Sequence, residues 1–536
     1  MLDPRPKLKS PMVHPFAGLD VAHLVRAQAA ARGAHPFLIW EPFEGEGRRW
    51  SYAEFAHEVA RLAAGLKARG VKLGDKVLIH LDNCPEAVLA WYACAHLGAV
   101  AVTTNARAAA GELAYFADHA GVVGAITQPV FAEMVASNAS PSKWLVVTET
   151  DNGAPPASAR PDGAEPFSAL YGDAADAPLR TPDPMAPVGI QYTSGTTSRP
   201  KGVVWTHANA LWGGQVCSIH EGLQPTDVHL TYLPFFHTNA QSYSILAALW
   251  AGASIVLQPR FSASRFWPIS LKHGCTWTST IPFCMKALAQ QDVPEAHSYR
   301  FWGTGVNAPP SDALFRVKTI GWWGMTETIT HGIIGHTHLP NTPLAMGKPS
   351  PFYQIAVVDD AGVPAEVGAV GHLLIKGMPG ISLFKEYLHN EEATFSSFDE
   401  DGFFKTGDRV ILLEDGSLKF ADRDKDMLKV GAENVAASEI ETVIMQVGGI
   451  AEVAVVAKKD PMLDEVPVAF LLVPGGVAAA PADLPDRVIA ACRQALAEFK
   501  VPREVRILDE FPRSTLEKIA KAELRKRLEA EEGASA

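Results

Sequence analysis

Several patterns that mark common protein classes are missing from this sequence. Its six cysteines are spread over 536 residues without a Cys-x-x-Cys pair. Neither a disulfide framework nor a cysteine-rich zinc site is therefore expected, and reduced thiols in a cytoplasmic protein fit the pattern better. The first residues, MLDPRPKLKSPMVHPFAG, contain no apolar run of the kind found in a signal peptide. We therefore expect a protein that is not secreted.

A long stretch without charged residues does not amount to a membrane span. Residues 228–259 contain no Asp, Glu, Lys or Arg, and their most apolar part is SYSILAALWAGASIVL. This part is shorter than the ~20 residues that cross a bilayer. We expect a buried helix that ends near Gly252, followed by a buried strand.

The composition excludes two further classes. Hydrophobic residues make up 47% of the chain and charged residues 20%, which excludes a largely disordered protein. The formal net charge of -12 argues against nucleic acid as a partner. The length predicts two to four structural units. Repeats of fixed period and heptads are absent, and the sequence leaves open whether the chain forms a homodimer.

Helix and strand patterns alternate through the first half of the chain. Ser51 and Glu54 have capping-box spacing ahead of a helical pattern that ends at Gly70. KVLIHL then predicts a strand, PEAVLAWYACAHLG a helix and AVAVT another strand. This alternation predicts parallel sheets covered by helices on both faces.

The pattern changes twice in the second half. Short β-rich pieces with turn signals occupy residues 373–420, and from about residue 424 strands and helices of a small α+β domain follow. The fold class expected from these observations is α/β, with an additional β-rich part and a small α+β part at the end of the chain.

One loop has the composition of a phosphate-binding site. The stretch YTSGTTSRPKGV follows a short buried strand, VGIQY, and precedes a helical pattern, ANALWGGQV. Backbone N–H groups and hydroxyls in such a turn can surround phosphate oxygens, and Lys201 adds positive charge. The spacing differs from a Walker A sequence, which ends in Gly-Lys-Ser or Gly-Lys-Thr.

Five further motifs follow this loop in order. They are PFFH (234–237), GWWGMTET (321–328), KTGD (405–408), RDKDMLKVGAEN (423–434) and PRSTLEK (512–518). Together with the loop they resemble the ordered motifs of the adenylate-forming superfamily, over nearly the whole chain. The resemblance implies an ATP-dependent carboxylic acid–CoA ligase that forms acyl-AMP and pyrophosphate, then acyl-CoA and AMP. The implied cofactors are ATP, Mg2+ and coenzyme A.

The resemblance also implies a domain plan. It gives an N-terminal adenylation domain over residues 1–422 with a β-rich subdomain at about 345–422, a hinge at 423–427 and a small mobile C-terminal domain over 428–536. In relatives the small domain rotates after adenylation, so that one site can carry out two reactions. The hinge residue that matches is Lys425.

The nucleotide would be held by residues of several motifs. Asp408 would accept hydrogen bonds from the ribose hydroxyls, aided by Arg423, and Mg2+ would be bound by Thr196 and Glu327. Trp323 would stack on adenine, with residues 303–305 on its other side. The residues implied for the nucleotide and for CoA are Thr193, Ser194, Gly195, Thr196, Thr197, Lys201, Gly303, Thr304, Gly305, Trp322, Trp323, Gly324, Met325, Thr326, Asp408, Arg423, Lys429, Gly431, Ala432 and Glu433.

Two residues match family positions close to the reacting groups. Lys518 would stabilise the charge that moves between the carboxylate and the α-phosphate during adenylation. Glu517 stands before it, where the family has glycine. His237 would gate the entry of the carboxylate and the thiol. The residues implied for catalysis are Lys518, His237, Glu327 and Thr196.

The acid is less well determined by the sequence. FSASRFW (261–267), GMTETITHGIIG (324–335) and KGMPGISLFKEY (376–387) resemble the crotonobetaine/carnitine-CoA ligase group. Its cationic acids suggest an aromatic cage, for which the acyl-pocket residues are Phe235, Phe236, His237, Trp302 and Trp322. A generic small-to-medium or cyclic carboxylic acid is the expectation, with a carnitine-like acid as its alternative. Two other functions stay open, namely loading of a separate carrier protein and adenylate binding without catalysis.

Overall fold

The computed structural model describes residues 13–140, 142–193, 200–423, 426–430, 433–460, 463–496, 498–513 and 518–535. Within these ranges the chain divides into two compact units. The first comprises residues 13–193, 200–355 and 375–404, and the second comprises residues 356–374 and 405–535.

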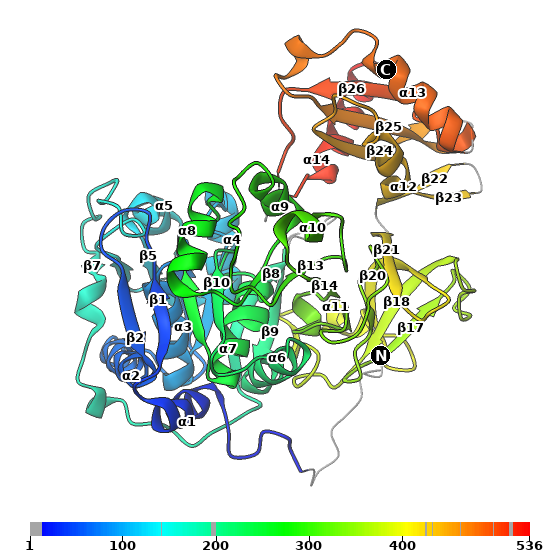
Figure 1. Ribbon diagram of the computed structural model, residues 1–536. Helices are drawn as coiled ribbons and strands as arrows, with labels where there is room; N and C mark the ends of the chain where they lie inside the picture. The colour runs from blue at the N-terminus through cyan, green and yellow to red at the C-terminus, as the bar shows by residue number, and fades with distance from the viewer. Residues whose placement is uncertain are drawn as a thin grey trace. The chain divides into compact units, whose positions relative to one another are not determined.

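A nine-stranded sheet forms one half of the first unit (Figure 1). The strands between its edges are parallel, and β2, β15 and β16 add antiparallel edges. In spatial order the strands are β16 (Lys348–Pro349), β15 (Ile333–Ile334), β14 (Thr319–Trp323), β13 (Phe301–Thr304), β12 (Trp277–Ser279), β10 (Val228–Thr231), β11 (Ser254–Leu257), β1 (Pro36–Trp40) and β2 (Arg48–Ser51).

An eight-stranded sheet forms the other half. Its strands from β8 to β7 in spatial order are parallel, whereas β9 and β19 are antiparallel additions at one edge. In spatial order the strands are β19 (Glu386–Tyr387), β9 (Lys201–Thr206), β8 (Pro187–Thr193), β4 (Val100–Thr103), β3 (Lys76–His80), β5 (Val122–Thr127), β6 (Leu145–Val147) and β7 (Glu165–Pro166).

The expectation of parallel sheets was therefore wrong at the edges, where the sheets are mixed. Strand β9 was not predicted from the sequence, although its residues KGVVWT are rich in β-forming side chains. The segment between β8 and β9 is short, and a short connection can join only antiparallel neighbours. The expected strand–loop–helix order is thus a hairpin followed by a helix.

Helices cover both sheets, and two of them are buried on nearly all sides. Eleven of the thirteen residues of α3 (Pro85–Leu97) and ten of the fourteen of α6 (His207–His220) are buried. A helix that is apolar all round belongs inside the protein, between layers. The other helices of this unit are α1 (Val21–Arg32), α2 (Tyr52–Ala68), α4 (Ala110–Ala120), α5 (Pro129–Asn138), η1 (Phe167–Leu170), η2 (Ala174–Asp176), η3 (Asn239–Leu246), α7 (Ala247–Ala251), α8 (Ala263–His273), α9 (Pro282–Leu288), α10 (Ser311–Phe315), η4 (Thr326–Thr328) and α11 (Glu391–Ser396).

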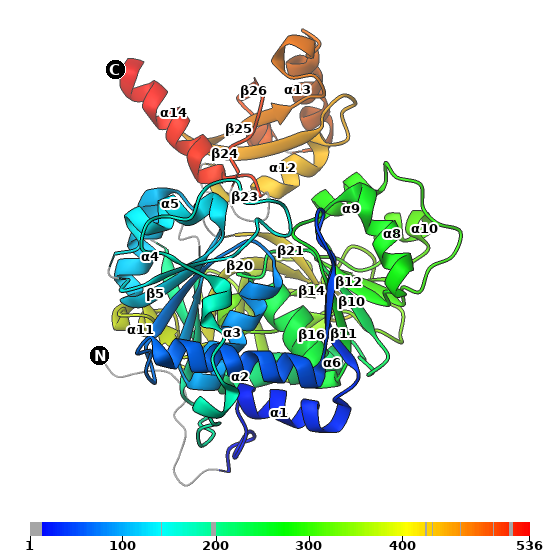
Figure 2. The ribbon, with the colours of Figure 1, turned by 90° about the vertical axis from the view of Figure 1, so that its left-hand side faces the viewer.

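Local sequence signals set several helix boundaries. The predicted capping box is present, because the Ser51 side chain accepts from the backbone N–H of Glu54 while the Glu54 carboxylate accepts from that of Ser51. The resulting helix α2 packs against α1 and α3 (Figure 2). In the uncharged stretch, η3 and α7 end at Gly252, whose φ of 77° suits glycine, and the buried strand β11 follows. Both expectations for this stretch are confirmed.

The second unit contains two further sheets. The four-stranded sheet has the order β17 (Gln354–Val358), β18 (Val370–Lys376), β20 (Phe404–Leu412) and β21 (Leu418–Arg423). The five-stranded sheet contains β23 (Glu433–Ala436), β22 (Met427–Val430), β25 (Asp464–Leu472), β24 (Glu452–Asp460) and, beside β25, β26 (Glu504–Leu508). The helices of the second unit are α12 (Ala437–Ile444), η6 (Val477–Ala479), α13 (Leu484–Ala495), η7 (Glu498–Lys500) and α14 (Lys521–Ser535). The α+β character expected for this region is confirmed.

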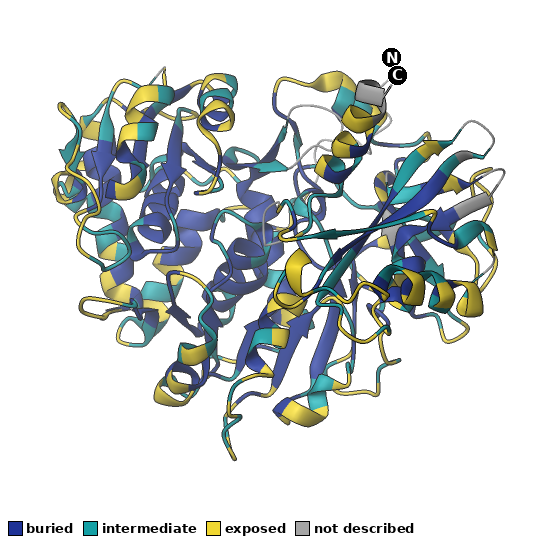
Figure 3. Cartoon of the chain, turned by 90° about the horizontal axis from the view of Figure 1, so that it is seen from above, coloured by how far each residue is buried: buried dark blue, intermediate teal, exposed yellow. Residues whose placement is uncertain are grey.

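Burial follows the sheets closely. The strands of the first unit are dark blue along most of their length in Figure 3, which marks them as buried. All six cysteines are buried and unpaired, in agreement with the expectation of reduced thiols. Among the described residues, the longest apolar helices are too short or too polar to cross a membrane.

Candidate active site

The phosphate-type loop connects the ends of two paired strands. Thr193 at the end of β8 and Lys201 at the start of β9 lie opposite each other in the antiparallel register. The loop therefore lies at the carboxyl end of β8, which is parallel to β4, and this edge of an α/β sheet is where ligands commonly bind. The predicted loop residues Ser194, Gly195, Thr196 and Thr197 lie outside the described residues.

A buried tyrosine links Lys201 to Glu327. The Tyr387 hydroxyl donates a hydrogen bond of 2.8 Å to Oε1 of Glu327, and Nζ of Lys201 lies 4.5 Å from the centre of the Tyr387 ring. Burial, and then the Glu327 carboxylate, raise the pKa of Tyr387 far above its ordinary value, so the phenol keeps its proton. Pairing of β19 with β9 brings Tyr387 to this position.

Tyr387 is not among the site residues predicted from the sequence. It is the last residue of the quoted motif KGMPGISLFKEY, so a motif-based signal was present. Lys201, which lies beside Tyr387 in space, is 186 positions earlier in the chain. Only the antiparallel pairing of the two-residue strand β19 with β9 brings Tyr387 to Lys201.

The motifs of β13 and β14 form one wall. The two strands are parallel, with Gly303 opposite Ile320 and Thr304 opposite Gly321. The indole of Trp322 covers Gly303 closely, because a Cβ atom added to Gly303 would lie 1.5 Å from Cη2 of Trp322. By contrast, a Cβ added to the exposed Gly305 would meet nothing within 4 Å. Trp322 therefore leaves no room for a side chain at position 303, whereas position 305 has room for one.

Further rings fix the position of Trp322. His331 stacks on it with ring centres 4.5 Å apart and an angle of 18°. Tyr243 of η3 contacts it edge-on at 5.9 Å. Trp322 itself is only 7% exposed. The wall beside Gly303 is therefore rigid and bulky.

The remaining residues of this motif run from the end of β14 into a tight turn. Trp323 is 7% exposed, and a Cβ added to Gly324 would lie 2.2 Å from the Tyr243 hydroxyl. The backbone N–H of Met325 donates to Oγ1 of Thr328 at 2.9 Å. The Thr326 carbonyl accepts a 2.9 Å hydrogen bond from Nε1 of Trp205.

Of the predicted pocket aromatics, Trp302 belongs to the core. It is fully buried, and its ring contacts those of Phe266, Trp267, Tyr299 and Phe315. A ring enclosed in this way has no surface left for a substrate. The predicted place of Trp302 in an aromatic cage is therefore not supported by its packing.

The motif PFFH lies just before the helix η3 and contains three predicted residues. The backbone N–H of Phe235 donates a 2.7 Å hydrogen bond to Oδ1 of Asn83, and Phe235 is buried. Phe236 and His237 are both partly exposed, and their ring centres are 4.3 Å apart. Unlike the ring of Trp302, these two rings are therefore not completely buried.

In the second unit, Asp408 and Arg423 lie opposite each other on β20 and β21. The strand register thus brings together the two residues predicted for the ribose. Asp408 is 5% exposed, and its backbone N–H donates to Oγ1 of Thr406 at 3.1 Å. A buried carboxylate on a rigid hairpin is well suited to accept hydrogen bonds from two vicinal hydroxyls.

The other predicted residues of the second unit lie on two segments. Lys429 is exposed on β22, and the hairpin with β23 pairs Val430 with Glu433. Lys518 is exposed and precedes Ile519, which bridges to Arg513. Lys425, Gly431, Ala432 and Glu517 lie outside the described residues.

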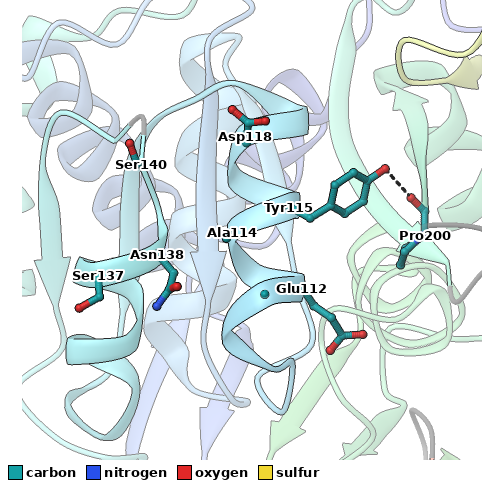
Figure 4. Close-up of a pocket in the computed structure, with 9 residues that line it drawn as sticks. Glu112, Ala114, Tyr115, Asp118, Ser137, Asn138, Ser140 and Pro200 are labelled. Carbon is teal, nitrogen blue, oxygen red and sulfur yellow. Dashed lines mark hydrogen bonds between the residues drawn. The ribbon is translucent and has the colours of Figure 1, made fainter.

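A surface cavity of about 690 Å3 lies between α4 and α5, beside the end of the loop (Figure 4). Tyr115 of α4 donates a 3.0 Å hydrogen bond to the carbonyl of Pro200 at its rim. The lining includes Glu112 and Asp118. Two carboxylates disfavour a polyphosphate, so this cavity is not the candidate nucleotide site.

Two family models match the chain. The model for the AMP-binding enzyme matches residues 25–388, and that for the AMP-binding enzyme C-terminal domain matches residues 439–518. The crotonobetaine/carnitine–CoA ligase of Salmonella paratyphi C is 33% identical over 514 residues, which cover 93% of this chain and 97% of the relative.

Solved structures agree in fold. The O-succinylbenzoate coenzyme A synthetase of Bacillus subtilis, solved with ATP and a magnesium ion, has a TM-score of 0.81 at 25% identity, covering 94% of this chain and 99% of that one. An anthranilate CoA ligase solved with anthranoyl-AMP has a TM-score of 0.84 at 22% identity, covering 97% and 99%. Taken with the family models and the near-complete match to a curated ligase, these likenesses show that the chain belongs to the AMP-binding enzyme family and is an AMP-forming acid–CoA ligase.

Proposed function

We propose that this ligase activates a small-to-medium or cyclic carboxylic acid. The observation that carries the proposal is the close contact between Trp322 and Gly303. The family resemblance implies Trp322 for the acyl pocket, and here its indole is held by His331 and Tyr243. A fixed indole leaves little depth for a long acyl chain.

The two half-reactions assign distinct roles to the chain's residues. In the first, a carboxylate oxygen attacks the α-phosphorus of ATP and pyrophosphate leaves. We assign the loop from Thr193 to Lys201 to the phosphates that leave. In the second, the thiol of CoA attacks the carbonyl carbon of the acyl-AMP, and AMP leaves with the oxygen that joined the two groups.

The residues around Glu327 suit a magnesium ion bound with ATP. The ion would neutralise phosphate charge, and a carboxylate oxygen is the type of ligand that Mg2+ prefers. We propose that Tyr387 positions Glu327 through its hydrogen bond of 2.8 Å. Lys201, whose ammonium group lies at the face of the same phenol ring, would meet the phosphates beside it. The second predicted ligand, Thr196, lies outside the described residues.

Residues of several motifs are proposed to bind the nucleoside. Trp323 would stack on adenine, with residues 303–305 on its other face, and the cross-strand pair Asp408 and Arg423 would bind the ribose. Lys518 would serve adenylation, and a rotation about Lys425 would then exchange it for residues 431–434 at the thiol entry. The domain plan with a hinge at 423–427 is part of this proposal.

A carnitine-like cationic acid is the alternative substrate. The curated relatives are named crotonobetaine/carnitine–CoA ligases, whereas the structurally similar proteins are named for anthranilate and O-succinylbenzoate. With Trp302 enclosed in the core, the predicted rings left for a cation–π cage are those of Phe235, Phe236, His237 and Trp322. Anthranilate and O-succinylbenzoate both contain a ring, which favours a cyclic carboxylic acid as the substrate.

Pyrophosphate release over a panel of acids tests the proposal. The panel contains carboxylates of increasing chain length, benzoate-type acids and trimethylammonium acids, each with and without CoA. Release only with acids of small-to-medium length or with a ring is expected. Selective release with the trimethylammonium acids would establish the alternative, and release only with long-chain acids would exclude the proposed substrate class.

A matched pair of variants tests the role of Trp322. Trp322→Leu is expected to extend the accepted chain length. Trp144 covers Gly124 in the eight-stranded sheet in the same way, with 1.9 Å between an added Cβ and its indole. Trp144→Leu should therefore leave the acid preference unchanged. Equal preferences in both variants and the native chain would remove Trp322 from the acyl pocket.

A further inference from the structure

Three metal-ligating side chains meet in the interior of the first unit, in a cluster that the ligase reaction does not use. Cys217, Glu221 and His331 each offer one ligand atom, and these atoms all lie within 4.8 Å of one another. Cys217 and Glu221 are four residues apart at the end of α6, so they share one helix face. His331 follows β14 and stacks on Trp322.

The cluster is closed to solvent. Cys217 and His331 are 0% exposed and Glu221 is 1% exposed. Among the described residues, neither carboxylate oxygen of Glu221 and neither ring nitrogen of His331 has a hydrogen-bond partner. The distance from Nε2 of His331 to Oε1 of Glu221 is 3.7 Å, which is too long for a hydrogen bond.

Such an arrangement is costly without a ligand. A buried polar group without a hydrogen bond costs about 1–3 kcal/mol, and a buried charge costs more. Arg300, whose positive charge acts on Glu221, is bound through two nitrogens to Asp227, at 2.9 and 2.7 Å. A cation held by all three side chains would give the Glu221 carboxylate and one ring nitrogen of His331 a partner.

The donor types select the ion. Thiolate, imidazole and carboxylate are ligands that Zn2+ favours, and beside three protein ligands a water molecule commonly fills the fourth position. Oγ1 of Thr330 lies 2.7 Å from Sγ of Cys217, so this hydroxyl oxygen is close enough to the cluster to serve as a further ligand. Tyr243, with its ring centre 4.2 Å from that of His331, holds the imidazole in one orientation together with Trp322.

The geometry points to a structural Zn2+ site formed by Cys217, Glu221 and His331. The ion would tie the end of α6 to the segment after β14, and so fix His331 beneath Trp322. This site is separate from the magnesium ligands proposed above, and its existence does not depend on which acid the enzyme activates.

Metal content and X-ray absorption of the full chain test the inference. Protein from zinc-replete cells is expected to contain about one Zn2+ per chain after dialysis, with one sulfur ligand at about 2.3 Å and the remaining ligands, nitrogen or oxygen, at about 2.0–2.2 Å. After chelation, Co2+ should restore one equivalent and give a thiolate-to-cobalt charge-transfer band. Less than a tenth of an equivalent, together with failure to bind Zn2+ or Co2+, would overturn the inference.

Variants locate the ion. Cys217→Ser and Glu221→Gln, which preserve side-chain size, are each expected to abolish the retained Zn2+. Cys275→Ser is the matched control, because Cys275 is also buried in this unit but belongs to no ligand cluster among the described residues. Retention of zinc by both cluster variants would place the ion elsewhere and refute the site. The absorption spectrum of the native protein decides the matter even if a variant fails to fold.

Discussion

The contact between Trp322 and Gly303 predicts a specific double-mutant result. Gly303→Ala places a methyl group 1.5 Å from Cη2 of Trp322, whereas non-bonded carbons need about 3.5–4.0 Å. The indole must therefore move by about 2 Å, against its stacking on His331. Gly305→Ala adds the same methyl group where nothing lies within 4 Å.

The magnitude follows from the cost of overpacking. Forcing a side chain out of a packed core costs about 1–3 kcal/mol, so Gly303→Ala should lower the free energy of unfolding of the first unit by this amount. Gly305→Ala should change it by less than about 0.5 kcal/mol. In the background Trp322→Leu, the penalty of Gly303→Ala should shrink by at least about 1 kcal/mol, because the clashing indole is gone.

Tryptophan fluorescence during urea unfolding measures this. All twelve tryptophans lie between residues 40 and 323, and so report on the first unit alone. If Gly303→Ala is as mild as Gly305→Ala, or if its penalty is the same with Leu at position 322, the described packing of this wall is incorrect.

Three further predictions concern the proposed chemistry and stability. Tyr387→Phe removes the 2.8 Å hydrogen bond to Glu327. Since a hydrogen bond to a charged group contributes about 1.5–3 kcal/mol, kcat/KM for adenylation should fall about tenfold or more, and the Mg2+ concentration that gives half-maximal activity should rise. An unchanged Mg2+ dependence would count against this role of Tyr387. Lys518→Ala should slow formation of acyl-AMP far more than thioester formation from supplied acyl-AMP, and equal losses in the two half-reactions would contradict the proposed division. Burial lowers the pKa of His80 from 6.5 to about 4, so as the pH falls the unfolded chain binds this proton before the folded chain does, and the free energy of unfolding drops between these two values. His80→Gln should reduce the slope of this drop by up to about 1.4 kcal/mol per pH unit. An identical slope in the variant and the native protein would contradict the prediction.

The sequence was sufficient for the order of the site motifs and for most elements, because capping, periodicity and glycine stops are local signals. The capping box at Ser51 and the helix end at Gly252 are examples. It was insufficient for β9 and β19, whose existence depends on pairing with each other and with β8. Tyr387 was missed for this reason.

The roles of aromatic residues were also hard to predict. Trp302 and Trp322 lie in similar motifs, yet one is enclosed by other rings and the other covers a glycine. Which face of a strand a tryptophan occupies, and what packs there, depends on helices distant in sequence such as α8. In the same way, His331 gained significance only when α6 brought Cys217 and Glu221 to it.

The central claim is that the acid is joined to AMP before it reaches CoA. An accepted acid labelled with 18O in both carboxylate oxygens, incubated with ATP, Mg2+ and CoA, tests it directly by mass spectrometry of the nucleotide. The account predicts AMP that carries one 18O atom, because the thiol displaces the oxygen that bridges the acyl group and the α-phosphorus. Unlabelled AMP, or ADP with 18O in inorganic phosphate, would contradict it.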